Sequence, residues 1–285
     1  MPQERTAPVE TLKVTAQGAI ETDDVLAVEE PLEIRVAWRT GGEQREKPIS
    51  VTMRTPGDDF DLAAGFLFTE ALIGSGAEIE GIRQWGSPNV VRVSLIDGAT
   101  IDAAKLDRHF YTTSSCGVCG KTSIDAVRVL KCGAGNPAGE TGTPARLPAP
   151  HRTPIERSLV HRLPEVLSEN QSAFRATGGL HGAAILRPNG ELLRTREDIG
   201  RHNAVDKVIG SLLREEPESL AGAILMVSSR ASFELAQKAI VAGIGVLASV
   251  GAPSTLAVDA AREFGLTLLG FVRDGRFNVY AGEVS

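Results

Sequence analysis

The sequence predicts an α/β protein, with a β-rich α+β N-terminal part followed by an α/β layered domain with a mainly parallel sheet. Two patterns lead to this class. In the first third of the chain, apolar residues stand at every second position, as in half-buried strands. In the second half, strand-like runs alternate with helical runs, which is typical of a layered α/β domain. The chain has 285 residues, of which 42% are hydrophobic, so it can bury a sizeable core.

The N-terminal part contains three alternating runs and one helical run. The predicted strands are 32–38, 49–53 and 91–95. A helix is expected to begin with Asp58 or Asp59 as its cap, because carboxylates accept hydrogen bonds from the free amides of a helix N-terminus. The apolar residues that follow at helical spacing are Leu62, Ala63, Phe66 and Leu67.

A Cys-x-x-Cys motif, at Cys116 and Cys119, comes next. It lies within small and polar residues, 112–121, among which only Val118 could anchor to a core. We therefore expect a mobile, solvent-accessible loop that presents two thiols. A helix is predicted directly after it, over 121–131, where apolar residues stand three apart.

A stretch rich in Gly, Pro and Thr separates the two parts. Residues 133–152 cannot bury enough apolar surface to fold alone, so we interpret them as a flexible linker between domains over 1–132 and 153–285. In the second domain, the predicted strands are 182–186, 223–227, 245–250 and 266–270, and the clearest helices are 204–213 and 256–264.

Charge and cysteine content exclude several classes of protein. The net charge of −6 argues against a general nucleic-acid binder, which would be basic. Three cysteines are too few for a secreted disulfide scaffold. The N-terminus lacks the apolar core of a signal peptide, and no apolar run reaches the ~18 residues of a membrane span. We expect a soluble cytoplasmic protein, whose thiols stay reduced and whose partners include neither nucleic acid nor membrane.

The position of the cysteines suggests sulfur chemistry. A helix over 121–131 would place Cys119 next to its N-terminus, where the helix dipole favours a thiolate, and Lys121 adds positive charge. Such a thiolate can attack sulfane sulfur and hold it as a persulfide, which a second thiol can shield or resolve by exchange. We hypothesise that Cys116 carries the sulfur and that Cys119 supports it.

Three other interpretations of the motif stay open. A thioredoxin-type pair usually follows a strand directly, whereas two serines precede this motif. A zinc site needs four ligands, which Cys116, Cys119, Cys132 and His109 could supply, although Cys132 stands at long spacing. Purely structural cysteines would need bulkier neighbours. We expect no stoichiometric zinc and interpret Cys132 as a small apolar residue at a helix end.

Three turns that follow predicted strands could hold an anion. They are 228–232, 251–255 and 271–276. In α/β sheets, ligands bind outside the carboxyl ends of the strands, where helix N-termini present free amides. Arg230, Arg273 and Arg276 could pair with a phosphate there. One turn alone would be weak evidence, because capped helices use the same residues.

A dense polar stretch, 197–207, opens the predicted helix over 204–213, which precedes the three turns in the chain. Its charged and imidazole side chains are Glu197, Asp198, Arg201, His202, Asp206 and Lys207. These side chains are more numerous than the capping of one helix requires. The stretch is either a solvated N-terminal turn with one satisfied histidine, or a site wall that contacts a polar ligand or a partner.

One stretch argues against a particular enzyme class. Residues 178–183 resemble zinc deaminases, because His181 stands before a strand. However, Ala183 occupies the place of the acid–base glutamate, and the Cys-x-x-Cys motif precedes the histidine and lacks the proline. Deamination is therefore not expected.

Four segments match a known family in the same order. They are 113–121, 198–207, 228–230 and 270–273. These segments resemble the FdhD family of formate dehydrogenase accessory proteins, which are sulfur carriers. The resemblance runs from about residue 30 to Tyr280, and the N-terminal residues and the linker depart from it.

The resemblance implies a specific role. Proteins of this family take sulfur from a cysteine desulfurase as a persulfide and pass it to the molybdenum cofactor, bis-molybdopterin guanine dinucleotide, before that cofactor enters formate dehydrogenase. It implies that Cys116 holds the persulfide, that the α/β domain has a cytidine-deaminase-like fold, and that the protein forms a homodimer. The rival hypothesis is a cofactor-delivery chaperone without covalent sulfur transfer.

The resemblance also implies cofactor contacts near the C-terminus. They are Phe271, Val272, Arg273, Asp274, Gly275 and Arg276. Ser229, Arg230, Arg201 and His202 are further candidate contacts. The dimer surface and the roles of His181, His202 and Lys207 are left open.

Overall fold

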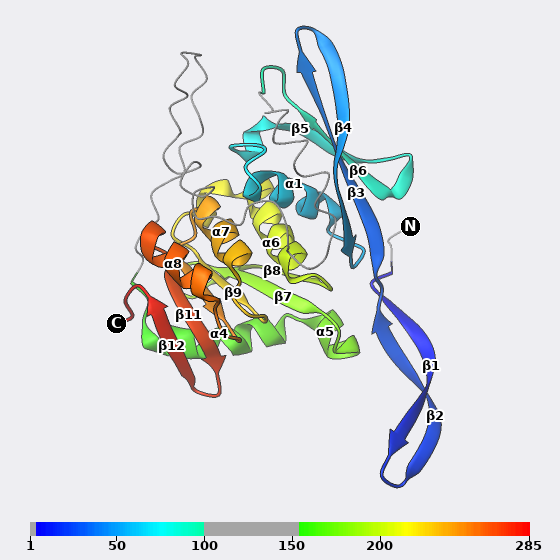
Figure 1. Ribbon diagram of the computed structural model, residues 1–285, viewed down its shortest axis with the longest axis vertical. Coiled ribbons are helices and arrows are strands. Elements are labelled where there is room, and N and C mark those ends of the chain that lie inside the picture. Colours follow the sequence, from blue (N-terminus) through cyan, green and yellow to red (C-terminus); the bar gives the residue numbers. More distant parts are fainter. Residues whose placement is uncertain (1–3, 100–153) are drawn as a thin grey trace.

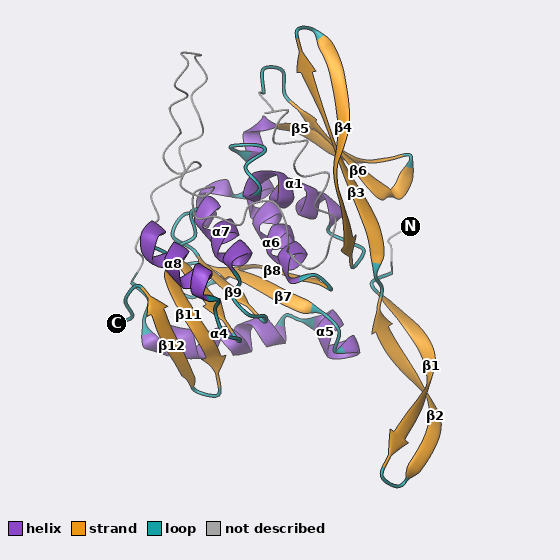
Figure 2. Ribbon diagram, in the orientation of Figure 1, coloured by secondary structure: helices purple, strands orange, loops and turns teal. Residues whose placement is uncertain are grey.

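The computed structural model describes residues 4–99 and 154–285, which form a mixed α/β structure with three sheets (Figures 1 and 2). The elements of the first range are β1 (Thr6–Thr15), β2 (Gly18–Ala27), β3 (Glu30–Thr40), β4 (Glu43–Arg54), α1 (Asp59–Thr69), η1 (Gly76–Glu78), β5 (Ile79–Trp85) and β6 (Ser87–Leu95). Those of the second range are α4 (Arg157–Glu169), α5 (Ser172–Thr177), β7 (His181–Leu186), β8 (Leu192–Asp198), α6 (Arg201–Glu215), η2 (Pro217–Leu220), β9 (Ile224–Val227), α7 (Phe233–Val241), β10 (Val246–Ser249), α8 (Thr255–Phe264), β11 (Thr267–Arg273) and β12 (Arg276–Ala281). The predicted α/β class is confirmed.

The N-terminal part is built on a four-stranded sheet with the order β4-β3-β6-β5. Alternate residues of β3, namely Leu32, Ile34 and Val36, are fully buried in one core with α1. The three strands predicted in this part lie within β3, β4 and β6, and α1 begins directly after Asp58, so the strands and the start of the helix are confirmed. The predicted carboxylate cap is wrong, because the side chain of Asp58 makes no capping hydrogen bond.

The larger sheet has the order β12-β11-β10-β9-β7-β8. Its central strands β9, β10 and β11 are parallel, but β7 pairs antiparallel with both β8 and β9, and β12 pairs antiparallel with β11. The prediction of a mainly parallel sheet is therefore wrong. The reason is that β8 and β12 follow their neighbours through short turns, which can join only antiparallel strands. The cytidine-deaminase-like detail stays a prediction.

Helices cover both faces of this sheet (Figure 2). In β9, Leu225 packs in one core with α6, α7 and α8, whereas Ile224 and Met226 pack in a second core with α4. This alternation follows from the period of two in a strand. The strand runs predicted for this domain coincide with β7, β9, β10 and β11, and its two predicted helices with α6 and α8.

The two parts share one hydrophobic core across helices α1 and α6. The helices approach so closely that a Cβ added at Gly65 would lie 1.9 Å from the carbonyl oxygen of Asp206, and one at Gly210 would lie 1.9 Å from that of Asp61. Glycine is needed at both crossings. The predicted linker, 133–152, and the predicted helix over 121–131 lie outside the described residues, so that domain division stays a prediction.

The strands β1 and β2 form a two-stranded ribbon that projects away from the rest of the molecule (Figure 1). Near its base, Val28 donates its backbone N–H to the carbonyl oxygen of Arg5 at 2.9 Å, and β2 contacts α5. The sequence pattern of these residues did not predict a ribbon. Among the described residues, no helix combines the length and apolar character that crossing a membrane would require.

Candidate functional site

The three turns predicted to hold an anion meet at one edge of the larger sheet, as the parallel order of β9, β10 and β11 requires. Gly251 accepts a hydrogen bond from the amide of Phe271 at 3.0 Å and donates its own amide to the carbonyl of Ser229 at 3.1 Å. Ala231 and Pro253 form a parallel bridge between the first two turns. We call residues 228–232, 251–255 and 271–276 the strand-end edge.

Two glycines allow these turns to lie against one another. A Cβ at Gly251 would lie 2.8 Å from Cγ of Arg230 and 3.0 Å from its Cα. A Cβ at Gly270 would lie 2.8 Å from the ring of Tyr280 and 2.9 Å from Cδ of Pro253. Side chains at either position would separate the turns, so the compactness of the edge depends on glycine.

The third turn is a β-hairpin whose backbone is unusual. Phe271 and Asp274 both have a φ of 53°, in the left-handed region that bulky residues rarely adopt. Val272 is buried, whereas Arg273 and Arg276 are exposed. The guanidinium carbon of Arg273 lies 5.9 Å from the centre of the Phe271 ring. The hairpin therefore anchors itself through Val272 and presents its two arginines to solvent.

The N-termini of three helices point toward the same edge. Helices α7 and α8 follow the strand-end edge directly, with Ser232 and Ser254 as their N-caps. Helix α6 begins there too, because β7 is antiparallel to both β8 and β9, so that β8 ends where β9 ends. Amides at the start of a helix favour an anion. The arrangement thus provides both amides and arginines.

Two histidines at this end are held in the neutral form. Burial lowers the pKa of His202 to about 4, and the charges of Lys238 and Arg201 add to the effect. Burial also lowers the pKa of His181, with a further contribution from Arg201 that Asp198 opposes. At neutral pH each imidazole therefore keeps one nitrogen as an acceptor.

Two buried polar atoms at these helix starts have no hydrogen-bond partner among residues 4–99 and 154–285. They are Nε2 of His202, at the start of α6, and Oγ of Ser232, the N-cap of α7. Leaving such an atom buried and unpaired costs about 1–3 kcal/mol. The two atoms could therefore pair with groups of a bound polar ligand.

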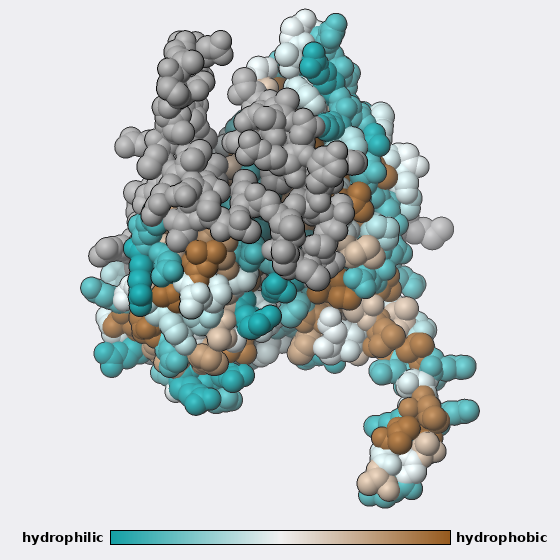
Figure 3. Space-filling model, in the orientation of Figure 1, coloured by the Kyte–Doolittle hydropathy of each residue, from teal (hydrophilic) through white to brown (hydrophobic). Residues whose placement is uncertain are grey.

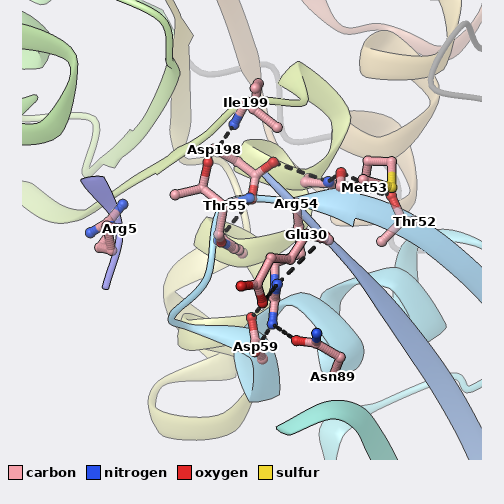
Figure 4. A network of polar contacts seen from close by, with 12 residues as sticks. Arg5, Glu30, Thr52, Met53, Arg54, Thr55, Asp59, Asn89, Asp198 and Ile199 are labelled. Atoms are coloured by element: carbon pink, nitrogen blue, oxygen red, sulfur yellow. Dashed lines mark hydrogen bonds and ion pairs between the residues drawn. The ribbon is translucent and has the colours of Figure 1, made fainter. Parts of the chain in front are cut away.

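The polar stretch 197–207 has a role that neither interpretation of the sequence predicted. Asp198 and Lys207 are completely buried and form an ion pair at 2.8 Å. Lys207 also donates to the carbonyl oxygen of Thr55 at 2.8 Å, and Asp198 accepts the amide of Thr55 at 3.2 Å. Figure 4 shows Asp198 beside Thr55. These residues therefore connect the end of β8 and the first turns of α6 to β4, the strand that ends at Arg54.

A second buried cation, Arg54, lies next to Thr55 in the chain and extends the buried polar network into the N-terminal part. Arg54 is fully buried, and its Nε and one terminal nitrogen each donate to Asp59 at 3.0 Å (Figure 4). It also donates to Asn89 at 2.9 Å and lies 3.4 Å from the Glu30 carboxylate. The paired geometry with Asp59 satisfies the guanidinium without water.

Asp206, in the same stretch, belongs to a third buried cluster. Its carboxylate lies 2.9 Å from Nζ of Lys238 and accepts a hydrogen bond from Thr69 at 2.7 Å. Burial alone would lower the pKa of Lys238, but the charges of Asp206 and Glu70 raise it above its usual value. Lys238 therefore stays charged and ties α7 to α1 and α6. Within the polar stretch, only Arg201 and His202 remain as candidate ligand contacts.

Several predicted site residues cannot be placed. Cys116 and Cys119, and the alternative zinc ligands Cys132 and His109, lie outside the described residues. Within residues 4–99 and 154–285, no three His, Cys, Asp or Glu side chains are grouped so that they could hold a metal ion.

The comparisons with known proteins agree on one family. The family model described as the FdhD/NarQ family matches residues 27–284. A relative from Streptomyces avermitilis, named Sulfur carrier protein FdhD, is 48% identical over 277 residues, which cover 93% of this chain and 90% of the relative. A relative of the same name from Sulfurisphaera tokodaii is 38% identical over 95% of both chains. A crystal structure described as a formate dehydrogenase accessory protein, from Desulfotalea psychrophila, has a TM-score of 0.72 at 21% identity over 98% of both chains, which shows a common fold.

Proposed function

Because the chain belongs to the FdhD/NarQ family, which confirms the resemblance seen in its sequence, we propose that it is a sulfur carrier and an accessory protein of formate dehydrogenase. One observation carries this proposal: a relative named as a sulfur carrier is 48% identical over 93% of the chain. The finer steps below rest on the residues of this chain. A cytoplasmic location, where thiols stay reduced, is part of this proposal.

In the first step, the thiolate of Cys116 attacks the terminal sulfur of a persulfide on a cysteine desulfurase. The S–S bond of the donor breaks, the donor cysteine leaves as a thiolate, and Cys116 holds the sulfane sulfur without net oxidation. In the second step, which follows binding of the acceptor, the thiolate of Cys119 attacks the inner sulfur of the Cys116 persulfide. A Cys116–Cys119 disulfide forms and the outer sulfur leaves as HS⁻, with its two electrons supplied by the dithiol.

The acceptor of this sulfur is proposed to be the molybdenum cofactor, bound through its guanine dinucleotide at the strand-end edge. Arg273, Arg276 and Arg230 are exposed and could pair with its phosphates, which favour guanidinium groups. The N-termini of α6, α7 and α8 would add amides. Nε2 of His202 could accept a hydrogen bond from the nucleotide, since it is buried and has no partner in the described part of the chain.

The sulfur step is tested by mass spectrometry. The purified protein is incubated with a cysteine desulfurase and cysteine, and its intact mass is measured with and without dithiothreitol. We expect a gain of ~32 Da, reversible by the reductant, because an exchangeable sulfane sulfur adds one sulfur atom. Cys116→Ala should abolish the gain, Cys119→Ala should retain it, and Cys132→Ala is the matched control. A gain that survives in Cys116→Ala and vanishes in Cys119→Ala would reverse the two roles.

The same experiment separates the proposal from its rival. A cofactor-delivery chaperone would gain no mass under any condition, yet would still bind the dinucleotide. Zinc bound by the cysteines would be detected by metal analysis of the same preparation and would block the persulfide, because a thiolate that ligates zinc is a poor nucleophile.

The binding step is tested with guanosine diphosphate, which carries the guanine and two phosphates of the dinucleotide. We expect Arg273→Ala and Arg276→Ala each to weaken binding about tenfold, since a charge-assisted hydrogen bond contributes about 1.5–3 kcal/mol. Arg39→Ala is the control, because Arg39 is an exposed arginine paired with Asp97 on the N-terminal sheet. Equal affinity of all three variants and the parent would remove the strand-end edge as the binding site.

A further inference from the structure

Helices α6 and α7 both start at the strand-end edge, and an ion pair joins their second turns. Lys238 of α7 lies 2.9 Å from the Asp206 carboxylate of α6, and both side chains are buried. His202 precedes Asp206 by four residues, and Glu234 precedes Lys238 by four. Residues four apart lie on the same face of a helix. The ion pair therefore places His202 and Glu234 opposite each other at the two helix starts.

The carboxylate of Glu234 is left without a partner at this place. It is half-buried, and within the described residues it has neither an ion pair nor a side-chain hydrogen bond. Burial lowers the pKa of His202, and the nearby Glu234 carboxylate opposes part of that shift, which agrees with their placement. A carboxylate can only accept hydrogen bonds. This position therefore suits a ligand group that carries N–H donors.

The start of α7 also offers donors. Ser232 is its N-cap, but its side chain makes no capping hydrogen bond. The first amides of a helix have no acceptor within the helix, and here they lack the usual acceptor from the cap as well. Free amide donors and a free carboxylate acceptor consequently stand next to each other at the beginning of α7.

The charge of Glu234 decides which part of a nucleotide can lie at α7. Only α7, of the three helices that start at this edge in the described chain, has an acidic residue in its first turn. That charge repels a phosphate. Arg273 and Arg276 attract one instead, on a hairpin tip that forms a hydrophilic projection at the lower edge of the body (Figure 3). The side chain of Arg230 also belongs to the phosphate side, because it lies against Gly251 in the turn before α8.

The Watson–Crick edge of guanine matches this arrangement. It presents a carbonyl acceptor beside two N–H donors, one on the ring and one on the 2-amino group. A carboxylate can accept hydrogen bonds from both donors while a backbone amide donates to the carbonyl. Adenine and cytosine do not carry two adjacent donors on this edge. Neighbouring packed helices lie about 10 Å apart, so the ribose would bridge a base at α7 and phosphates at α8.

We propose that Glu234 is the residue that selects guanine, by accepting hydrogen bonds from its two N–H donors at the start of α7. This inference rests on the proposed function, because it concerns the base of the dinucleotide that is proposed to bind at the strand-end edge. It assigns the base to one helix start and the phosphates to the arginine side, and it adds a specificity-determining residue to the candidate contacts.

The first test compares nucleoside diphosphates by isothermal titration calorimetry on the full-length chain. Inosine diphosphate differs from guanosine diphosphate only in lacking the 2-amino group, and adenosine diphosphate lacks both donors. The parent should bind guanosine diphosphate about tenfold more tightly than inosine diphosphate, and adenosine diphosphate more weakly still, because each hydrogen bond to a charged group that is lost weakens binding.

The second test reverses the preference. Glu234→Gln replaces one acceptor oxygen by an amide that donates. The variant should bind guanosine diphosphate about tenfold more weakly than the parent does. It should bind xanthosine diphosphate more tightly than the parent does, because xanthine carries a carbonyl where guanine carries the 2-amino group. A side chain that only supported the fold would change the affinity for every base alike.

The matched control is Glu218→Gln, which changes an exposed acidic residue in the first turn of η2, at the other end of β9. It should bind all four diphosphates as the parent does. A cooperative thermal transition in each variant shows that the chain is folded.

The outcomes separate this inference from the proposed function. If Glu234→Gln kept the parent's ratio of guanosine to xanthosine diphosphate affinity while Arg273→Ala still weakened binding, Glu234 would not contact the base and the phosphate contacts would stand. A parent that bound adenosine diphosphate as tightly as guanosine diphosphate would also overturn the selection of guanine. A parent that bound none of the diphosphates would overturn both this inference and the proposed binding site.

Discussion

The substitution Lys207→Met tests whether the polar stretch at the start of α6 holds the two parts of the molecule together. Methionine keeps much of the length and apolar volume of the lysine stem while removing the ammonium. In the parent, that ammonium lies 2.8 Å from the Asp198 carboxylate and 2.8 Å from the carbonyl of Thr55, with both charged side chains fully buried.

The expected loss of unfolding free energy depends on the hydrogen bonds that Asp198 keeps without Lys207. Removing one partner of a buried ion pair destabilises a protein by about 3–5 kcal/mol, because the other charge is left in a medium that solvates it poorly. Here Asp198 would still accept hydrogen bonds from the amides of Thr55 and Gly200 and from the side chain of Asn203. These bonds offset part of the loss, so we expect about 3 kcal/mol.

The assay is equilibrium unfolding in urea, with linear extrapolation of the free energy to water. The matched control is Arg214→Met on the same helix. Arg214 lies 2.8 Å from Asp61, but its side chain is 39% exposed, and such pairs contribute at most about 1 kcal/mol. If Lys207→Met lost no more free energy than Arg214→Met, the buried pair would not be the connection that we describe.

Two further predictions concern the packing of α6 and the titration of its first turn. Gly65→Ala should lower the unfolding free energy by about 3 kcal/mol or more, because its Cβ would lie 1.9 Å from the carbonyl oxygen of Asp206. The control is Gly81→Ala, whose Cβ would meet nothing within 4 Å, and it should have a far smaller effect in the same urea titration. Since the pKa of His202 falls to about 4 on folding, the unfolded chain binds the extra proton between about pH 6.5 and 4, and stability should decline as pH falls through that window. His202→Gln should reduce this decline by up to about 1.4 kcal/mol per pH unit, and identical pH profiles for parent and variant would show that His202 is not held neutral.

The fold was predictable wherever burial imposed a period on the sequence. Leu32, Ile34 and Val36 alternate because one face of β3 is covered, and the same reasoning located α6 and α8. Helix α4 was not predicted although Val160 and Leu163 are fully buried, because Pro164 lies inside it and normally argues against a helix.

The edge strands β8 and β12 could not be predicted from periodicity in the same way. Strand β12 has one buried residue, Ala281, and its other residues are half-buried or exposed, so it has no strong alternation. Missing β8 and β12 is what made the larger sheet look mainly parallel, since the strands that remain in sequence are separated by helices.

For the candidate site, the sequence located the turns but not the partners of the polar stretch. The strand-end turns could be found because chain direction fixes which ends of parallel strands lie together. By contrast, Lys207 bonds to Thr55, 152 residues earlier in the chain. No local pattern distinguishes a lysine that reaches a distant carbonyl from one that reaches a ligand.

The polar stretch therefore combines two kinds of residue on one helix. Asn203, Asp206 and Gly210 recur at the three- and four-residue spacing of a single helical face, and this face meets α1 and the end of β4. Arg201 and His202 stand in the first turn, beside the strand-end edge. A Lys207 variant that loses sulfur transfer would consequently do so through lost stability, so its unfolding free energy must be measured alongside its activity. A loss in an Arg201 variant of unchanged stability would instead report on the site, because Arg201 is only half-buried and is not part of the connection to Thr55.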